Sequence, residues 1–174
     1  MGLKAGRRRK DRSDPFAMLE RSHERLRENL SCLLEAASAL NTNPGDFAAR
    51  DQVVEVAAFI DRAVTRHELD EEQSLFPLLR GHREVADLIG RLEVEHRAHE
   101  KLHEQLHEIA AHAADAALDA AGVSELSDLA VTLSQVYTQH IEAEELDLFP
   151  AARTLLTAAQ ATAVADEMQA RRGR

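Results

Sequence analysis

The stretch HELDEEQSLFPLL, residues 67–79, is repeated in pattern by HIEAEELDLFPAA at residues 140–152, and this repeat indicates how the chain is organised. Both copies keep a histidine, a glutamate four residues later and a Leu-Phe-Pro ending. A histidine and a glutamate at this spacing lie on the same face of an α-helix. The repeat therefore predicts two helices that each present an imidazole beside a carboxylate.

The repeat extends beyond these two segments to the first and third helices. Three pairs of residues lie 73 positions apart: His23 and His96, His67 and His140, and Glu71 and Glu144. In each half, 44 residues separate the first histidine from the second. We therefore expect two helical hairpins related by an approximate two-fold axis, which would bring both halves of one site together at the middle of the molecule.

Apolar residues spaced three and four apart predict four long amphipathic helices, separated by turn-forming residues at 41–46, 77–81 and 119–122. Short connections between such helices predict an all-α fold, an antiparallel up-down four-helix bundle with a short C-terminal helix. Hydrophobic residues make up 44% of the chain but aromatic residues only 3%, so the core must consist mostly of Ala, Leu and Val. We expect residues 15–174 to form this bundle and residues 1–14 to be a basic, disordered tail.

Polar residues mark where the helices begin. Asp46 is the expected N-cap of the second helix, and Ser124 is the expected N-cap of the fourth. Thr157 followed by Gln160 has the form of a capping box, which predicts a short terminal helix that reaches about Arg171.

Charge and composition exclude several classes of protein. The net charge of -10 argues against a general nucleic-acid binder, although the basic segment at residues 4–12 is either a solvated tail or a contact for phosphate. No window approaches the roughly 18 apolar residues that span a bilayer. The single cysteine, Cys32, has no internal disulfide partner, and the first 14 residues contain no apolar signal sequence. We therefore expect a cytoplasmic protein that does not bind membranes.

Four histidines and two glutamates fall on the expected inward faces of the helices: His23, His67, Glu71, His96, His140 and Glu144. An isolated histidine on an apolar face is most often a hydrogen-bonded core residue. Burying six such groups without partners, however, costs on the order of several kcal/mol each, which a marginally stable domain does not tolerate. A bound metal would satisfy all of them.

The types of ligand narrow the choice of metal. Four imidazoles and two carboxylates exceed a single zinc site, and nitrogen and oxygen donors without a thiolate suit iron, with manganese as the alternative. Glu71 and Glu144 face each other and are placed to bridge two metals, which predicts a dinuclear carboxylate site. Ferritin-like di-iron bundles instead use Glu-x-x-His, so the order found here indicates a different family.

These motifs resemble the hemerythrin-like family, also called the HHE cation-binding domain. The residues that carry the resemblance are His23, His67 with Glu71, Glu95-His96, and His140 with Glu144, within residues 15–171. The resemblance implies a four-helix bundle with two non-haem iron ions that are joined by an oxo or hydroxo bridge. It also implies O2, peroxide or nitric oxide as the small ligand.

The resemblance leaves three functions open. The first is binding or sensing of O2 or a related diatomic or small oxidant, which requires an open coordination position. The second is a redox enzyme that consumes peroxide or nitric oxide, and the third is iron storage or homeostasis. Neither the oligomeric state nor a protein partner follows from the sequence.

The chain departs from the oxygen-carrying members of this family on its third helix. Those members have His-x-x-x-His there, whereas this chain has His96-x-x-x-Glu100, so Glu100 is the expected additional carboxylate ligand. A carboxylate favours the ferric state, and we therefore expect rapid oxidation by O2 rather than reversible transport. The expected assignment places His23 and His67 on one iron, His96, His140 and Glu100 on the other, and Glu71 and Glu144 between them.

Five further side chains near these motifs have less certain roles. Glu68 is either a weaker ligand or a solvated helix residue. His99 and His103 either support the metal ligands, as hydrogen-bond donors, a proton relay or a secondary metal site, or are partly exposed structural histidines. Tyr137 either contacts a bound oxygen species, ligates the metal as a phenolate, or is a core tyrosine with a satisfied hydroxyl. Glu145 is expected to be exposed.

Overall fold

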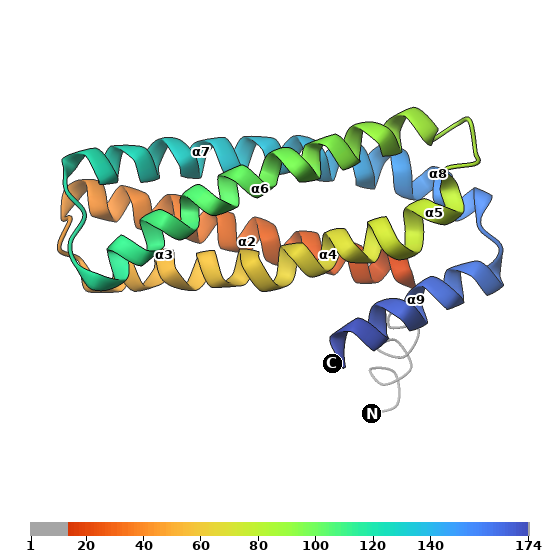
Figure 1. Ribbon diagram of the computed structural model, residues 1–174, viewed down its shortest axis with the longest axis horizontal. Coiled ribbons are helices and arrows are strands. Elements are labelled where there is room, and N and C mark those ends of the chain that lie inside the picture. The colour runs from red at the N-terminus through yellow and green to blue at the C-terminus, as the bar shows by residue number, and fades with distance from the viewer. Residues whose placement is uncertain (1–13, 174) are drawn as a thin grey trace, which may run out of the picture.

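The computed structural model describes residues 14–173, in which four long helical segments lie side by side and alternate in direction (Figure 1). They are α2 (Pro15–Thr42), the run from α3 to α5, α6 (Ala86–Asp115), and the run from α7 to α8. No strand occurs within residues 14–173, so the predicted all-α antiparallel bundle is confirmed. The tail expected at residues 1–14 lies outside the described residues except for Asp14, the N-cap of α2.

The second and fourth segments are interrupted by π-helical turns. The second consists of α3 (Phe47–Phe59), η1 (Ile60–Val64), α4 (Thr65–Asp70), η2 (Glu71–Leu75) and α5 (Phe76–Leu79). The fourth consists of α7 (Ala120–Ala143), η3 (Glu144–Leu148) and α8 (Phe149–Leu155). The turns η2 and η3 therefore occupy equivalent positions in the repeat, and each begins at the glutamate of a His-x-x-x-Glu motif.

A proline explains the position of both turns. Pro77 and Pro150 are the second residues of α5 and α8, directly after η2 and η3. A proline inside a helix lacks an N–H donor and its ring clashes with the carbonyl four residues earlier, and a wider turn relieves that clash. The N–H of Phe76 accordingly donates to the carbonyl of Glu71, five residues before it, and η3 repeats this bond.

The expected helix caps are correct at two of three places. Asp46 caps α3, and Thr157 with Gln160 forms the predicted capping box of α9 (Ala158–Arg172). The assignment of Ser124 as the fourth N-cap is wrong, because α7 begins earlier. There Asp119 accepts a hydrogen bond at 2.8 Å from the backbone N–H three residues on. A carboxylate caps a helix as well as a hydroxyl does and also interacts favourably with the helix dipole.

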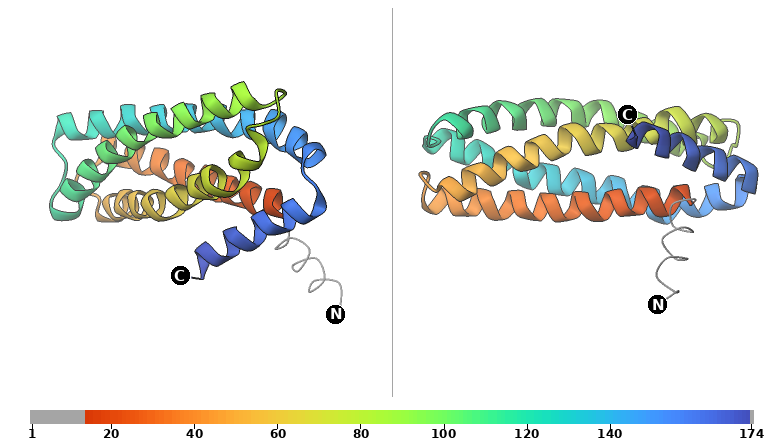
Figure 2. Two further views of the ribbon diagram at one scale, coloured as in Figure 1. Left: turned by 45° about the vertical axis from the view of Figure 1, so that its right-hand side comes forward. Right: turned by 90° about the horizontal axis from the view of Figure 1, so that it is seen from below.

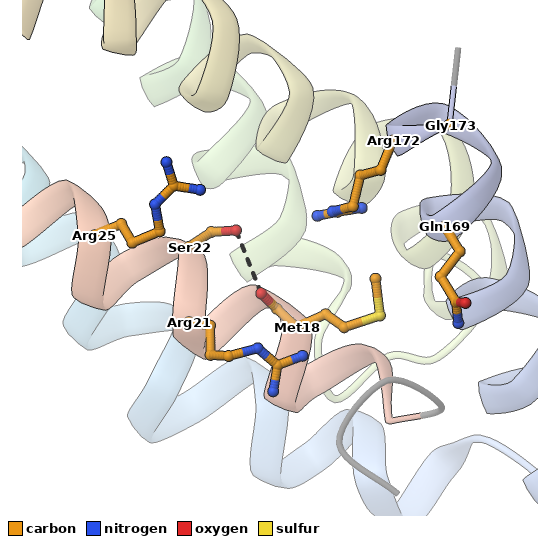
Figure 3. Close-up of a pocket in the computed structure, with 7 residues that line it drawn as sticks. All are labelled: Met18, Arg21, Ser22, Arg25, Gln169, Arg172 and Gly173. Carbon is orange, nitrogen blue, oxygen red and sulfur yellow. Dashed lines mark hydrogen bonds between the residues drawn. The ribbon is translucent and has the colours of Figure 1, made fainter. Parts of the chain in front are cut away.

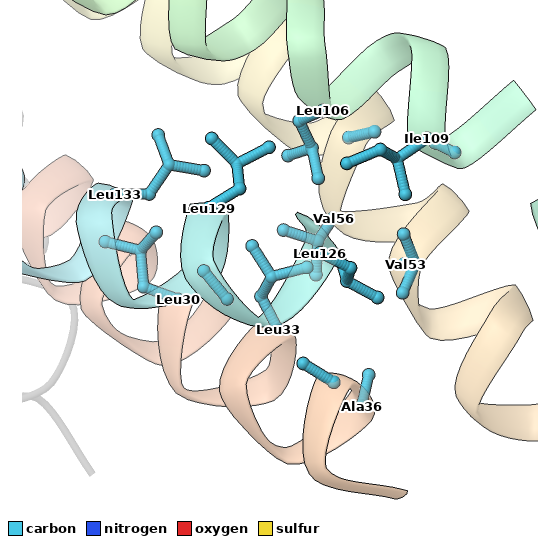
Figure 4. Packing of buried hydrophobic residues seen from close by; sticks show 14 of the residues in the cluster. Leu30, Leu33, Ala36, Val53, Val56, Leu106, Ile109, Leu126, Leu129 and Leu133 are labelled. Carbon is cyan, nitrogen blue, oxygen red and sulfur yellow. The ribbon is translucent and has the colours of Figure 1, made fainter. Parts of the chain in front are cut away.

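The apolar core is divided into two clusters along the bundle axis. One cluster fills the end where α3 packs against α2 and α6, and includes Leu33, Leu106 and Leu126 (Figure 4). The other surrounds Phe76 and Phe149 at the opposite end. Between the two clusters, each long helical segment buries polar side chains. Within residues 14–173, no helix has the length and apolar character needed to cross a membrane.

The C-terminal helix α9 crosses the end of the bundle and packs against α2, α4 and η2 (Figures 1 and 2). Asp70, at the end of α4, is fully buried and pairs with Arg171 at 2.8 Å and Arg172 at 2.7 Å. Arg171 also donates to the hydroxyl of Ser74 in η2 at 2.7 Å. Burial raises the pKa of Asp70 in spite of both arginines. This cluster therefore ties α9 to the turn that carries Glu71.

Replacing both arginines should destabilise the fold, because it leaves the carboxylate of Asp70 buried without a partner. We expect Arg171→Ala combined with Arg172→Ala to lower the free energy of unfolding by about 3 kcal/mol. The control is Arg80→Ala, which breaks a surface pair with Glu93 and should cost about 0–1 kcal/mol. Urea unfolding of the metal-free proteins measures the free energy of unfolding of both variants. Equal losses of this free energy would contradict the role given to Asp70.

Candidate metal centre

Six of the seven residues expected as ligands meet at the middle of the bundle, between the two apolar clusters. They form two overlapping groups, and within each group the candidate ligand atoms all lie within 4.8 Å of one another. The groups are His23, His67, Glu71 and Glu144, and Glu71, His96, His140 and Glu144. All six residues are buried, and the two glutamates belong to both groups. This is the arrangement of a binuclear metal site with shared carboxylates.

Glu144 presents one oxygen to each pair of histidines. Its Oε2 lies 2.9 Å from Nε2 of His23, and its Oε1 lies 2.9 Å from Nε2 of His140. Glu71 does the same at longer range, because its Oε1 lies 3.5 Å from Nε2 of His67 and its Oε2 lies 3.5 Å from Nε2 of His96. Each carboxylate thus faces both groups, as a bridging ligand must.

The site leaves electron pairs without partners, and this is the test of whether its residues fit a metal. Neither carboxylate oxygen of Glu71 accepts a hydrogen bond from residues 14–173, and the oxygens of Glu144 face only the imidazole nitrogens of the two groups. The Nε2 atoms of His23 and His67 are 3.1 Å apart, and those of His96 and His140 are also 3.1 Å apart. Two nitrogens bound to one metal at right angles would be separated by about 3 Å. The donor set therefore fits two cations.

Three carboxylates outside the two groups orient the imidazoles. Glu145 lies 2.8 Å from Nδ1 of His23, and Glu72, at the equivalent position of the repeat, lies 2.8 Å from Nδ1 of His96. Glu95 lies 2.8 Å from Nδ1 of His140. In a neutral imidazole, an Nδ1–H that donates to a carboxylate leaves the lone pair of Nε2 facing the site, as binding to a metal requires.

The expectation that Glu145 is exposed is wrong, because its side chain is only 26% exposed. Both of its oxygens also accept hydrogen bonds from Arg27, at 3.1 and 2.8 Å. The repeat could have predicted this role, because Glu145 and Glu72 occupy equivalent positions, each one residue after a shared glutamate.

His67 is the exception among the four imidazoles. Its Nδ1 is buried and has no hydrogen-bond partner within the described part of the chain. The repeat explains the difference, because position 22 is a serine where position 95 is a glutamate. The hydroxyl of Ser22 donates instead to the carbonyl of Met18 at 3.3 Å. The two pairs of histidines therefore have unequal surroundings.

Burial and charge shift the protonation of these groups in opposite directions. Burial and the nearby carboxylate of Glu144 raise the pKa of Glu71 well above its ordinary value. Burial also opposes ionisation of Glu144, but His140 and the other imidazoles outweigh it and hold the pKa of Glu144 well below the ordinary value. Burial lowers the pKa of His67 to about 4. The same desolvation acts on His140, where Glu144 and Glu95 outweigh it and raise the pKa to about 9.

The structure does not bring Glu100 to the site. Glu100 is exposed and belongs to neither group. The buried positions of α6 alternate in steps of four and three through Leu92, His96, His99 and His103, so the inward residue after His96 is His99. The expectation of a seventh ligand, and the argument for rapid oxidation that depended on it, therefore have no support in this geometry.

Tyr137 and His103 form a buried pair beside the site. The hydroxyl of Tyr137 lies 2.6 Å from Nε2 of His103. Burial raises the pKa of Tyr137 well above its ordinary value and lowers the pKa of His103 to about 4, so the hydrogen bond joins a neutral phenol and a neutral imidazole. Of the readings open for Tyr137, the structure favours a core tyrosine with a satisfied hydroxyl.

Two other side chains line the outside of the candidate ligands. The ring of His99 packs against those of Tyr137 and His140, with centroids 4.5 and 5.2 Å away. Burial lowers the pKa of His99 to about 3. Glu68 is half-buried and belongs to neither group, and burial raises its pKa to about 8. His99 therefore packs against the site from outside the two groups, whereas Oε1 of Glu68 is buried without a hydrogen-bond partner in the described part of the chain.

Comparison with known protein families agrees with this geometry. The sequence model of the family described as "Hemerythrin HHE cation binding domain" matches residues 14–171. That span contains both His-x-x-x-Glu motifs and every member of the two groups. No curated protein and no solved structure matches the chain.

Glu71→Gln should have opposite effects on the metal-free and the metal-loaded protein. Because its pKa is raised, Glu71 must bind a proton when the metal-free protein folds at neutral pH, and this costs stability. A glutamine is neutral without that cost and can donate to Glu144, so the metal-free variant should be more stable than wild type by about 1–3 kcal/mol. It should also hold less metal, because Glu71 contributes to both groups. Thermal unfolding with and without metal tests this expectation.

The control for this substitution is His103→Gln, which changes a buried residue that belongs to neither group. It should leave the metal content unchanged. If Glu71→Gln destabilises the metal-free protein and keeps its metal, the role given to Glu71 is wrong.

Proposed function

Because the chain belongs to the hemerythrin HHE cation-binding domain family, we propose that its buried centre holds two non-haem iron ions and binds or senses O2 or a related small molecule, peroxide or nitric oxide. The observation that carries this proposal is the pair of shared carboxylates, each of which faces both pairs of histidines. Imidazole and carboxylate donors without a thiolate suit iron better than a structural zinc.

In this proposal each pair of histidines holds one iron. His23 and His67 serve one ion, His96 and His140 serve the other, and Glu71 and Glu144 lie between them. Bound iron would supply redox chemistry and affinity for O2, peroxide and nitric oxide. The chain would supply a site between two apolar clusters, where few water molecules compete, and carboxylates that hold three of the imidazoles in the orientation that ligation needs.

The space beside the site favours a small ligand over iron storage. A cavity with a volume of about 20 Å³ is lined by His23 and His67. A single water molecule needs about 10–15 Å³, so this cavity admits a small molecule but not a mineral core. Consumption of peroxide or nitric oxide is the alternative, because it needs the same opening together with a supply of electrons.

The proposal predicts the metal content and the response to ligands. Protein purified from iron-supplied cells should contain two irons per chain and absorb in the near ultraviolet through charge transfer to iron. After reduction without air, the iron-loaded protein should change its spectrum when mixed with one equivalent of O2 or nitric oxide. Elemental analysis and stopped-flow spectroscopy provide the two measurements.

Two controls separate the possible outcomes. His103→Gln should load like wild type, whereas Glu144→Gln should not. Continued consumption of peroxide or nitric oxide over many equivalents would favour the enzyme. A fully loaded protein with one metal, or with zinc in preference to iron, would contradict the proposal.

A further inference from the structure

A pocket on the surface lies between α2 and α9 (Figure 3). Its volume is about 440 Å³, within the roughly 300–1,000 Å³ of ligand-binding pockets. Arg21, Arg25 and Arg172 all line it. No acidic residue is among the described residues that line the pocket, although the whole chain has a net charge of -10.

Contacts inside the protein hold two of these arginines at the pocket. The guanidinium carbon of Arg25 lies 5.2 Å from the centroid of the Phe59 ring. Arg172 pairs with Asp70 at 2.7 Å and donates to the backbone carbonyl of Met168, and both contacts hold its guanidinium group at the pocket. Figure 3 shows the guanidinium groups of Arg25 and Arg172 on either side of the hydroxyl of Ser22.

The surface pocket adjoins the small cavity beside the metal centre. Ser22 and Arg25 line both of them, and the inner cavity of about 20 Å³ ends at His23 and His67. Ala63 in η1 forms part of the inner wall. Both linings thus share Ser22 and Arg25, which places the surface pocket directly beside the cavity that ends at the imidazoles.

The other half of the chain does not repeat this path. The repeat partners of Arg21 and Arg25 are Val94 and Ala98, so the positive charges have no counterpart. The partners of Leu26 and Val64, which line the inner cavity, are His99 and Tyr137, and both are buried beside His140. Larger side chains therefore fill the equivalent place at the second pair of histidines.

We propose that the arginine-lined pocket binds small inorganic anions and delivers them through the inner cavity to the metal centre beside His23 and His67. This inference rests on the proposed function, because it adds a second class of ligand, small inorganic anions, to the neutral ligands proposed for the same centre. A pocket lined by one sign of charge raises the local concentration of the opposite ion and its rate of association. Guanidinium groups stay charged across the physiological range, so the attraction does not depend on a titration.

The first test uses chloride and the metal-free protein, so that it does not depend on iron. Bound chloride broadens the chlorine-35 magnetic resonance line of free chloride. We expect wild type to broaden this line more than Arg25→Gln does. The matched control is Arg97→Gln, which removes an exposed arginine from α6 and should broaden it as wild type does.

The second test uses azide as the anionic probe and iron-loaded, oxidised protein. Azide is narrow and absorbs strongly when it binds ferric iron, so stopped-flow spectroscopy gives its association rate. Arg25→Gln should slow azide at least threefold at low salt, and the difference should shrink as salt screens the charge. Nitric oxide, which is neutral, should bind the reduced variant at the wild-type rate. Ala63→Leu, compared at equal iron content, should slow both probes because it fills the inner cavity.

The outcomes separate this inference from the proposed function. A protein that holds no pair of irons refutes the proposed function, while the chloride experiment still tests the pocket. Equal chloride broadening by wild type and Arg25→Gln would overturn anion binding in the pocket. If iron-loaded Arg25→Gln binds azide at the wild-type rate, delivery through the pocket is overturned. If Arg97→Gln slows azide as much as Arg25→Gln does, the effect comes from the overall charge of the protein, and this too overturns delivery through the pocket.

Discussion

The fold depends on one constraint, which is that two carboxylates and four imidazoles are buried together, and the oxygens of Glu71 and Nδ1 of His67 have no hydrogen-bond partner within residues 14–173. A helical bundle can tolerate such a group only if the surrounding helices hold it in a geometry that a cation completes. The two apolar clusters at either end stabilise the helices, and the polar groups between them specify how the helices face each other. The metal centre is therefore part of the core.

Each shared glutamate is the first residue of a π-helical turn. Pro77 and Pro150 each follow a π-helical turn that begins at Glu71 or Glu144. Carboxylates at Glu72, Glu95 and Glu145 then fix three of the imidazoles. The C-terminal helix adds a constraint in the first half only, because the repeat partner of Asp70 is Ala143 and forms no ion pair.

The sequence predicts the bundle and the six meeting residues because both follow from periodicity. Apolar spacing places the helices, and the 73-residue repeat selects the inward polar residues. The position of Glu100 outside the site does not follow from the sequence, because Glu100 matches the four-residue spacing of the motifs. In α6, the next buried residue after His96 is His99, three positions on. The π-helical turns and the role of Glu145 need geometry, because a helical wheel assumes a regular helix and places residue 145 toward solvent. Asp119 and Ser124 are both good caps, and only the buried packing of Leu118 and Val123 decides between them.

We propose that one site holds two metals with Glu71 and Glu144 between them. Anomalous diffraction at the iron absorption edge measures the number and the positions of these metals. Crystals of the iron-loaded protein should show two peaks about 3.5–4 Å apart, one beside His23 and His67 and the other beside His96 and His140. A single peak, or iron located away from these six side chains, would contradict a site that holds two metals.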